Sequence, residues 1–249
     1  MTAALETSGL VKRFGGLTAT DNVSIRIERG TRHALIGPNG AGKTTLINLL
    51  TGVLSPSGGR IFLEGEDITG LKPEQRVKRG LARTFQINQL FPALTPFETL
   101  ALAVFERRGQ GGNLWRGAAD RSVVDEVHDV ARQFRLLDVL HDETSSLAYG
   151  RQRLLEIAIA IACKPRLLLL DEPAAGVTET DRLELLKTIA ELPKDVTVLL
   201  IEHDMDLVFR FAERISVLVN GAVLTEGVPE EVARDPRVRA VYLGERAHG

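Results

Sequence analysis

Apolar and polar residues alternate near the start of the chain, a pattern typical of a half-buried antiparallel strand. The apolar positions are Val23, Ile25 and Ile27. Short strands are also predicted over residues 33–36 and 60–63. Between them, leucines on one helical face predict a helix over residues 43–50.

The middle of the chain is predicted to be helical. Thr95 and Glu98 form a capping box with proline at the first helical position, so a helix begins here and extends to about Glu106. A glycine-rich loop follows over residues 107–117. A second helix is indicated by apolar residues at helical spacing, namely Val123, Val124, Val127, Val130, Ala131 and Phe134. We predict a helical subdomain over residues 88–150.

After residue 150 the chain returns to alternating helices and strands. An unbroken apolar run over residues 167–170 predicts a strand buried on both faces. Helices are predicted over residues 151–163, 178–192 and 205–211, and a second strand is predicted over residues 196–201. Asn220-Gly221 predicts a two-residue hairpin turn. The fold class is therefore α/β, with residues 1–87 and 151–249 as the core.

One segment matches the phosphate-binding pattern G-x-x-x-x-G-K-[ST] in full. It runs Gly37-Pro38-Asn39-Gly40-Ala41-Gly42-Lys43-Thr44, between a predicted strand and a predicted helix. Its glycines let several backbone N–H groups face one anion, and the helix N-terminus adds partial positive charge. Lys43 is predicted to reach the β- and γ-phosphates, and the Thr44 hydroxyl to ligate Mg²⁺.

Two acidic residues follow the predicted strand over residues 167–170. A buried parallel strand ends at the sheet edge where ligands bind, so Asp171 and Glu172 are predicted to lie at the phosphate site. Asp171 would hold Mg²⁺ through water, and Glu172 would face the attacking water. The chain lacks a guanine-reading Asn-Lys-x-Asp, and Phe14 is a candidate for stacking on a purine ring. These features predict a P-loop ATPase or GTPase.

Composition narrows the functional classes. The 31 basic and 33 acidic residues give a net charge of −2, which argues against a nucleic-acid protein that binds through bulk positive charge. The single cysteine excludes an internal disulfide and suits a reducing compartment. No apolar run is long enough to span a membrane, and the N-terminus lacks the features of a secretory signal. A cytosolic chain that reaches a membrane through a partner is expected.

Four further motifs occur in a fixed order with the phosphate loop and the acidic pair. They are Lys12-Arg13-Phe14, Thr84-Phe85-Gln86, Leu147-Ala148-Tyr149-Gly150-Arg151-Gln152 and Ile201-Glu202-His203-Asp204. In this order they resemble the adenine-stacking loop, the Q-loop, the signature motif and the switch histidine of the ATP-binding cassette (ABC) transporter ATPases. The resemblance covers nearly the whole chain. It implies a P-loop NTPase core with an antiparallel β subdomain and an inserted helical subdomain.

The resemblance also implies ATP and Mg²⁺ as ligands, and two cassettes that close head to tail around two ATP molecules. Each nucleotide would lie between the phosphate loop of one cassette and the signature motif of the other. The phosphate loop would extend to Thr45, and Gly150 of the signature motif would offer its backbone N–H. Gln86 would contact Mg²⁺ and the attacking water. His203 would contact the γ-phosphate and orient Glu172.

Two segments depart from the general family pattern. The signature has Ala148 where serine is usual, Tyr149 and Arg151 replace glycine and glutamine, and the segment after Glu172 lacks the usual aspartate. At these departures and in several other segments, the chain resembles the ATPases of branched-chain amino acid importers. The segments are Arg83-Thr84-Phe85-Gln86, Leu147-Ala148-Tyr149-Gly150, Ala174-Ala175-Gly176, Ile201-Glu202-His203-Asp204-Met205, Glu226-Gly227-Val228-Pro229-Glu230-Glu231 and Tyr242-Leu243-Gly244.

This subgroup implies an ATPase that powers uptake of branched-chain amino acids or related small polar solutes. Its partners would be a second ATPase subunit (the same chain or a related one), two transmembrane permease subunits and, indirectly, a periplasmic or extracellular solute-binding protein. No nucleic acid is expected. The chain would be peripheral, at the cytoplasmic face of the plasma (inner) membrane. The alternatives are the ATPase of a lipid or lipopolysaccharide exporter, whose tail is similar, and a soluble non-transport ABC ATPase.

Apolar residues gather near the entrance of the predicted subdomain. They are Ile87, Leu90, Phe91, Leu94 and Phe97. Two interpretations are open: a core of the subdomain, or a groove that receives a cytoplasmic helix of a membrane subunit.

Overall fold

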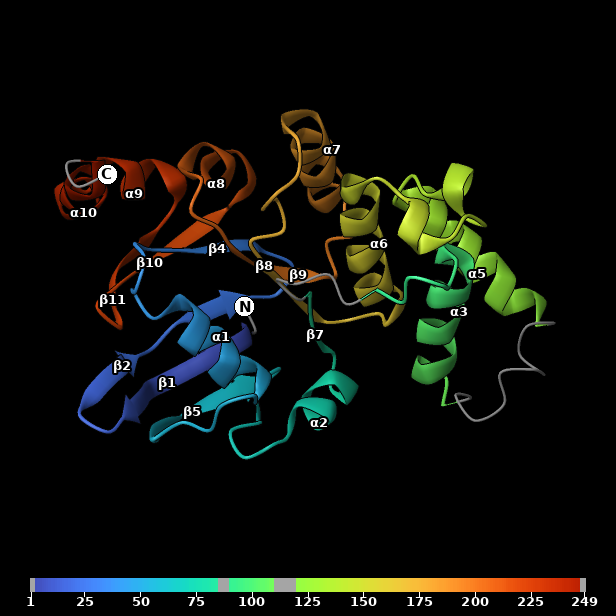
Figure 1. Ribbon diagram of the computed structural model, residues 1–249. Helices are drawn as coiled ribbons and strands as arrows, with labels where there is room; N and C mark the ends of the chain where they lie inside the picture. Colours follow the sequence, from blue (N-terminus) through green and yellow to red (C-terminus); the bar gives the residue numbers. More distant parts are fainter. Residues whose placement is uncertain (1–2, 85–89, 110–119, 247–249) are drawn as a thin grey trace. The chain divides into compact units, whose positions relative to one another are not determined.

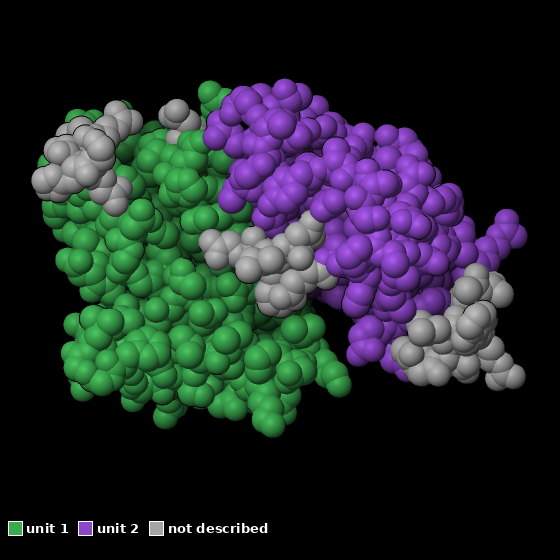
Figure 2. All heavy atoms as spheres, in the orientation of Figure 1, with its two compact units in different colours: residues 1–83, 166–172, 193–249 green, residues 84–165, 173–192 purple. Residues whose placement is uncertain are grey.

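The computed structural model describes residues 3–84, 90–109 and 120–246 (Figure 1). Its contacts divide the chain into two compact units, coloured separately in Figure 2. Unit 1 comprises residues 1–83, 166–172 and 193–249, and unit 2 comprises residues 84–165 and 173–192. Each unit is described by itself below.

Unit 1 contains an antiparallel sheet with the strand order β2-β1-β5-β6, in which β3 also pairs with β1. Its strands are β1 (Ala3–Phe14), β2 (Leu17–Val23), β3 (Arg26–Glu28), β5 (Gly58–Leu63) and β6 (Glu66–Asp67). The pattern analysis did not predict β1. Gly9 in this strand has a φ of 56°, and the pairing register shifts nearby. Such irregularities change the phase of the apolar alternation, so the sequence shows no regular period of two.

The second sheet of unit 1 has the order β11-β10-β4-β9-β8-β7 and is parallel except for the β10–β11 hairpin. Its strands are β4 (Arg32–Ile36), β7 (Leu81–Arg83), β8 (Leu167–Asp171), β9 (Thr197–Ile201), β10 (Arg214–Val219) and β11 (Ala222–Gly227). The buried strand predicted over residues 167–170 is confirmed in β8. The hairpin is confirmed as well, because Asn220 and Gly221 both have a positive φ, as a two-residue primed turn requires.

The core of unit 1 forms around α1 (Lys43–Thr51), whose apolar residues belong to one buried cluster with strands of both sheets. The carboxyl end of α1 is capped by a buried arginine from α2 (Pro73–Lys78). Arg76 donates to the carbonyl oxygens of Leu49 and Leu50 in the last turn of α1, each at 2.7 Å, and the Leu49 oxygen also accepts from Gly52 N at the C-cap. The remaining helices of unit 1 are α8 (Met205–Phe211), α9 (Pro229–Arg234) and α10 (Pro236–Arg246).

Unit 2 is helical within its described residues. Its helices are α3 (Pro96–Arg107), α5 (Arg121–Gln133), α6 (Tyr149–Ala162) and α7 (Glu179–Ala190), with single 3₁₀ turns at Leu137–Val139 and Thr144–Ser146. The predicted capping box is confirmed, since Glu98 N donates to Thr95 Oγ1 at 3.2 Å and Thr95 N donates to Glu98 Oε2 at 2.8 Å. Contacts group α6 and α7 with this unit, whereas the sequence analysis assigned residues 151–249 to the core. That functional division stays a prediction.

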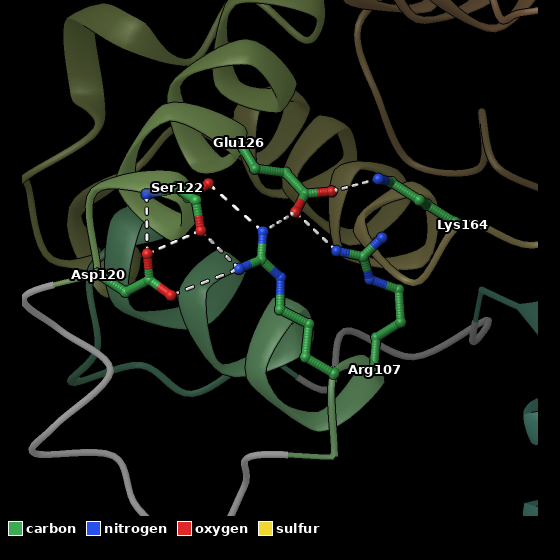
Figure 3. A network of polar contacts seen from close by, with 6 residues as sticks. Arg107, Asp120, Ser122, Glu126 and Lys164 are labelled. Atoms are coloured by element: carbon green, nitrogen blue, oxygen red, sulfur yellow. Dashed lines mark hydrogen bonds and ion pairs between the residues drawn. The ribbon is translucent and has the colours of Figure 1, made fainter.

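One carboxylate ties together three segments of unit 2 (Figure 3). Glu126 of α5 pairs with Arg107 at 2.6 Å and Arg108 at 2.8 Å, at the end of α3, and with Lys164 at 2.8 Å, just after α6. Burial acts to raise the pKa of Glu126, but hydrogen bonds from Lys164, Arg108 and Arg107 outweigh it and lower the pKa to about 2. The ionised carboxylate therefore stabilises the folded unit.

We expect Glu126→Gln to lower the free energy of unfolding at pH 7 by about 1–3 kcal/mol, because three cations lose the negative charge with which they pair. The pKa of Glu126 lies below its ordinary value of 4.5, so this stabilisation is present above pH 4.5 and is lost as the pH falls towards 2. Urea unfolding at pH 7 and at pH 3.5 tests this, with Asp129→Asn on the exposed face of the same helix as control. An equal difference at both pH values would contradict the prediction.

Candidate functional site

The phosphate loop joins β4 to α1, and two of its glycines are required by close backbone approaches. A Cβ on Gly37, whose φ is 157°, would lie 2.1 Å from the carbonyl oxygen of Leu218. A Cβ on Gly42, whose φ is 97°, would lie 2.4 Å from the carbonyl oxygen of Ala19. No side chain fits at either position, so glycine here serves both the left-handed backbone and the packing.

The β10–β11 hairpin supports this loop from outside. Gly221 N donates to the carbonyl oxygen of Ala41 at 2.9 Å, and the carbonyl oxygen of Gly221 accepts from Asp21 N at 2.8 Å. Lys43 Nζ donates to the carbonyl oxygens of Gly37 at 2.5 Å and Pro38 at 2.9 Å. The Lys43 ammonium group therefore lies against the phosphate loop, where the sequence predicted that it would bind phosphate.

The first turn of α1 offers groups for binding an anion and a cation. Gly42 caps α1 without any side-chain hydrogen bond, and the first N–H groups of a helix have no acceptors of their own. Thr44 is exposed and Thr45 half-buried, and in the loop before them Asn39 and Gly40 are also exposed. The loop and this turn together can hold phosphate, with a hydroxyl beside it for a metal.

Asp171, the predicted magnesium carboxylate, is the last residue of β8 and is 5% exposed. Arg83, the last residue of β7, donates from Nη2 to Asp171 Oδ2 at 2.8 Å. From Nη1 the same guanidinium donates to Asn48 Oδ1 of α1 at 2.9 Å. The carboxylate is therefore held in place by a cation at the carboxyl edge of the sheet.

Glu172 and His203 follow neighbouring parallel strands and are brought together. Asp171 of β8 lies opposite Ile201 of β9, so the residues just beyond meet at the same edge. His203 Nδ1 is 3.6 Å from Glu172 Oε1 and 3.8 Å from Glu202 Oε2. The histidine side chain is 64% exposed, whereas Glu202 is buried beneath it. An exposed imidazole beside a carboxylate is suited to orienting a base and contacting an anion.

Phe14 ends β1 and is 46% exposed. Lys12 Nζ lies 5.1 Å from the ring centroid, a cation–π contact that supports one side of the ring. Phe14 pairs with Leu17 across the hairpin, two residues before Ala19, whose carbonyl oxygen approaches Gly42. The aromatic ring thus belongs to the hairpin that borders the phosphate loop.

The signature segment lies in unit 2, at the start of α6. Ala148 caps this helix without a side-chain hydrogen bond, as expected from the missing serine. Gly150 packs so tightly that an added Cβ would lie 2.6 Å from the carboxyl carbon of Asp181. Tyr149 accepts from Arg153 at 2.6 Å and donates to the carbonyl oxygen of Ala175 at 3.4 Å. Tyr149 therefore connects the signature segment to the segment after Glu172.

Two further observations concern metals and membranes. Within residues 3–84, 90–109 and 120–246, no group of three or more His, Cys, Asp or Glu side chains is arranged to hold a metal ion. This is compatible with Mg²⁺, which keeps several waters and uses one or two protein ligands together with phosphate oxygens. Among the helices of the described ranges, none has both the length and the apolar character needed to traverse a bilayer. Gln86 lies outside the described residues.

Family models decide the classification. A model described as "ABC transporter" matches residues 20–175, which contain the phosphate loop and the acidic pair. The chain belongs to the ABC transporter family. A second model, "Branched-chain amino acid ATP-binding cassette transporter", matches residues 222–248 of this ABC protein. The family resemblance stated from the motifs is confirmed.

Similar proteins and structures cover nearly the whole ABC chain. It is 41% identical to the high-affinity branched-chain amino acid transport ATP-binding protein BraF of Pseudomonas aeruginosa, and 43% identical to LivG of Salmonella typhimurium, covering 97% of this chain and 98% of the relative in both cases. The solved cassette MJ1267 of an ABC transporter matches with a TM-score of 0.84 at 30% identity, covering 97% of this chain and 99% of the other. Its ADP conformation matches with a TM-score of 0.83 at 31% identity, covering 98% and 100%. The predicted ABC ATPase fold class is confirmed.

Arg83, Asn48 and Gly221, which contact the candidate site of this ABC protein, were not among the site residues predicted from the sequence. Arg83 ends a three-residue strand that was not predicted, so its place at the sheet edge was not apparent. Gly221 was assigned only to a turn. The available signal for Arg83 was a lone arginine immediately before the Q-loop motif.

Proposed function

We propose that this protein is the ATP-binding and ATP-hydrolysing subunit of an importer for branched-chain amino acids or related small polar solutes. One observation carries the ATPase assignment: at the carboxyl edge of the parallel sheet of unit 1, the phosphate loop with Lys43 precedes α1, and Asp171, Glu172 and His203 end or follow β8 and β9. The names of BraF and LivG, and the family model matched by the C-terminal segment, support the cargo.

The residues present fit ATP and Mg²⁺. The loop from Gly37 to Thr45 supplies glycine-shaped backbone and a lysine for phosphates, and Phe14 supplies an exposed ring for adenine. The Thr44 hydroxyl and the Asp171 carboxylate, with Gln86, are oxygen donors of the kind that Mg²⁺ prefers. When bound, the ion draws negative charge from the β- and γ-phosphates.

The protein's own groups then divide the work. Lys43 and the first N–H groups of α1 bind and orient the phosphates. Glu172 Oε1 accepts a proton from the attacking water, and His203 orients this carboxylate and contacts the γ-phosphate. Gly150 at the start of α6 contributes its backbone N–H group to the nucleotide of a second cassette. Gln86 contacts Mg²⁺ and the attacking water, as the family resemblance implies, and completes the proposed catalytic set with Glu172 and His203.

The proposed assembly has two ATPase subunits, identical or related, on two permease subunits, with a periplasmic or extracellular solute-binding protein outside. The chain is peripheral, on the cytoplasmic face of the plasma (inner) membrane, and its residues 88–150 form the subdomain that contacts the permease. Phe91 supports this contact because the residue is 59% exposed, whereas Leu90, Leu94 and Phe97 are partly buried. Ile87 lies outside the described residues.

Reconstitution with the permease subunits and the binding protein that are encoded by neighbouring genes tests the proposal. ATP hydrolysis is expected to rise when binding protein loaded with a branched-chain amino acid is added. Phe91→Asp is expected to abolish that stimulation while ATP binding stays within about twofold, because the charge is placed on an apolar docking surface. Leu183→Asp, at another exposed apolar residue of unit 2, is the control and should stay coupled. Stimulation by a lipid substrate would favour the exporter, and indifference to every membrane partner would favour a soluble role.

A further inference from the structure

Arg83 contacts two parts of the candidate magnesium site: the carboxylate of Asp171 and the helix α1. Its Nη2 donates to Asp171 Oδ2 at 2.8 Å, and its Nη1 donates to Asn48 Oδ1 at 2.9 Å. The Arg83 side chain is mostly buried, and the Asp171 side chain almost completely so. The two partners are far apart in sequence and come from β8 and α1, respectively.

Asn48 lies four residues after Thr44 on α1, and residues four apart share a helix face. The guanidinium therefore connects Asp171 to the helix face that carries the predicted hydroxyl ligand. Mg²⁺ demands near-ideal octahedral geometry, so its ligands need to be held within about half an ångström. Thr44, the predicted ligand, and Asp171, which would hold the ion through water, are on separate elements, and a side chain that binds both elements can set the spacing between them.

The chemistry of arginine suits this task. Its planar guanidinium presents several N–H donors in a fixed fork, so two acceptors can be held at once in a defined relative position. A lysine ammonium is a point charge on a flexible stem and provides no such fork. The contact also engages Asp171 Oδ2, and an ionised carboxylate retains further acceptor capacity for a metal or its water.

We propose that Arg83 is a positioning residue for Mg²⁺: it holds Asp171 and the Thr44-bearing face of α1 at the spacing that magnesium coordination requires. The inference rests on the proposed ATPase function. It predicts a selective loss. Magnesium-dependent steps weaken when Arg83 is replaced, while magnesium-free nucleotide binding, which uses the loop and Lys43, does not.

Charge alone predicts the opposite sign. Removing a cation from beside a metal-binding carboxylate would strengthen its attraction for Mg²⁺. A purely structural ion pair would lower thermal stability and change nucleotide binding equally with and without metal. The direction of the change in Mg²⁺ dependence distinguishes a positioning role from a charge effect. The difference between nucleotide binding with and without metal distinguishes it from a purely structural ion pair.

The experiment measures binding of a fluorescent ATP analogue, with Mg²⁺ and with EDTA, and the Mg²⁺ concentration for half-maximal ATP hydrolysis. Arg83→Gln is expected to raise that concentration about 10–100-fold, the usual effect of losing a group that orients a metal ligand. Its affinity for the analogue in EDTA should stay within about twofold. Arg83→Lys and Asn48→Ala should raise the half-maximal concentration by smaller factors, because each keeps part of the arrangement.

Arg79→Gln is the matched control, since Arg79 forms an exposed ion pair with Glu66 in the same unit. It should change neither measurement. Circular dichroism and thermal melting report folding, and if Arg83→Gln does not fold, Arg83→Lys and Asn48→Ala decide the matter. Unchanged or tighter Mg²⁺ dependence, or equal losses with Mg²⁺ and EDTA, overturns the inference. A wild-type protein without magnesium-dependent hydrolysis would instead overturn the proposed function.

Discussion

Lys43→Ala is expected to abolish tight ATP binding and to slow hydrolysis by at least about 10²-fold, the usual effect of removing one preorganised charge-stabilising group. Lys43 Nζ lies on the phosphate loop, bound to the carbonyl oxygens of Gly37 and Pro38. A side chain held there can transfer its hydrogen bonds from these carbonyls to the phosphates. No other lysine occurs in the segment from Gly37 to Thr51, so alanine leaves no substitute within it.

The variant should remain folded. Alanine has the highest helix propensity, and removing a positive charge from the N-terminal turn of α1 relieves an unfavourable interaction with the helix dipole. Thermal melting should therefore change little, while isothermal titration with ATP and a phosphate-release assay should show the loss. Lys78→Ala, on the exposed side of α2, is the control and should retain both properties. Near-normal hydrolysis by Lys43→Ala would show that the loop is not the nucleotide site.

Glu172→Gln is expected to retain ATP binding and to slow hydrolysis by about 10²–10⁴-fold, the range for a positioned general base. The glutamine amide keeps the size of the side chain but lacks the basic carboxylate near His203 Nδ1. Because hydrolysis no longer consumes ATP, the nucleotide should hold two cassettes together. Size-exclusion chromatography should then show a dimer with ATP and a monomer with ADP.

The control for this prediction is Glu74→Gln, at an exposed glutamate of α2 that belongs to none of the motifs. It should hydrolyse ATP at the wild-type rate and give no ATP-stabilised dimer. Hydrolysis by Glu172→Gln within a few-fold of wild type would mean that another group accepts the proton. Glu202, whose Oε2 lies 3.8 Å from His203 Nδ1, is a poorer acceptor than Glu172, because it is buried and its Oε2 accepts from the His203 backbone N–H at 3.2 Å.

Much of the candidate site could be predicted because its parts are encoded in contiguous residues. The phosphate loop needs glycines at particular backbone conformations, and Gly37 and Gly42 adopt them. Asp171 ends a strand whose unbroken apolar run indicated burial on both faces, and the structure has that strand fully buried. The hairpin at Asn220 was predictable for the same reason. Its Asn-Gly pair favours a positive φ at adjacent residues, and Asn220 adopts a φ of 49°.

Secondary structure was harder to predict where local patterns are short or irregular. The three-residue strand β7 is too short to show a period, and α2 and β6 are also only a few residues long. The sequence analysis named neither β1 nor β7, although both pair within the sheets of unit 1. Periodicity needs several repeats before it can be distinguished from chance.

The family, the order of the motifs and the residue types of the phosphate site could be inferred from the sequence, because these depend on backbone conformation and on neighbours along the chain. Which side chains from distant segments meet became apparent only in the folded chain. Arg83 lies 35 residues from Asn48 and 88 from Asp171, and they meet because β7 and β8 are adjacent parallel strands at one edge of the sheet. Likewise, α6 is apolar on several faces, so its pattern did not show that it would pack with α3, α5 and α7. Strand order and helix packing are set by the summed contacts of the whole chain, and no local period encodes them.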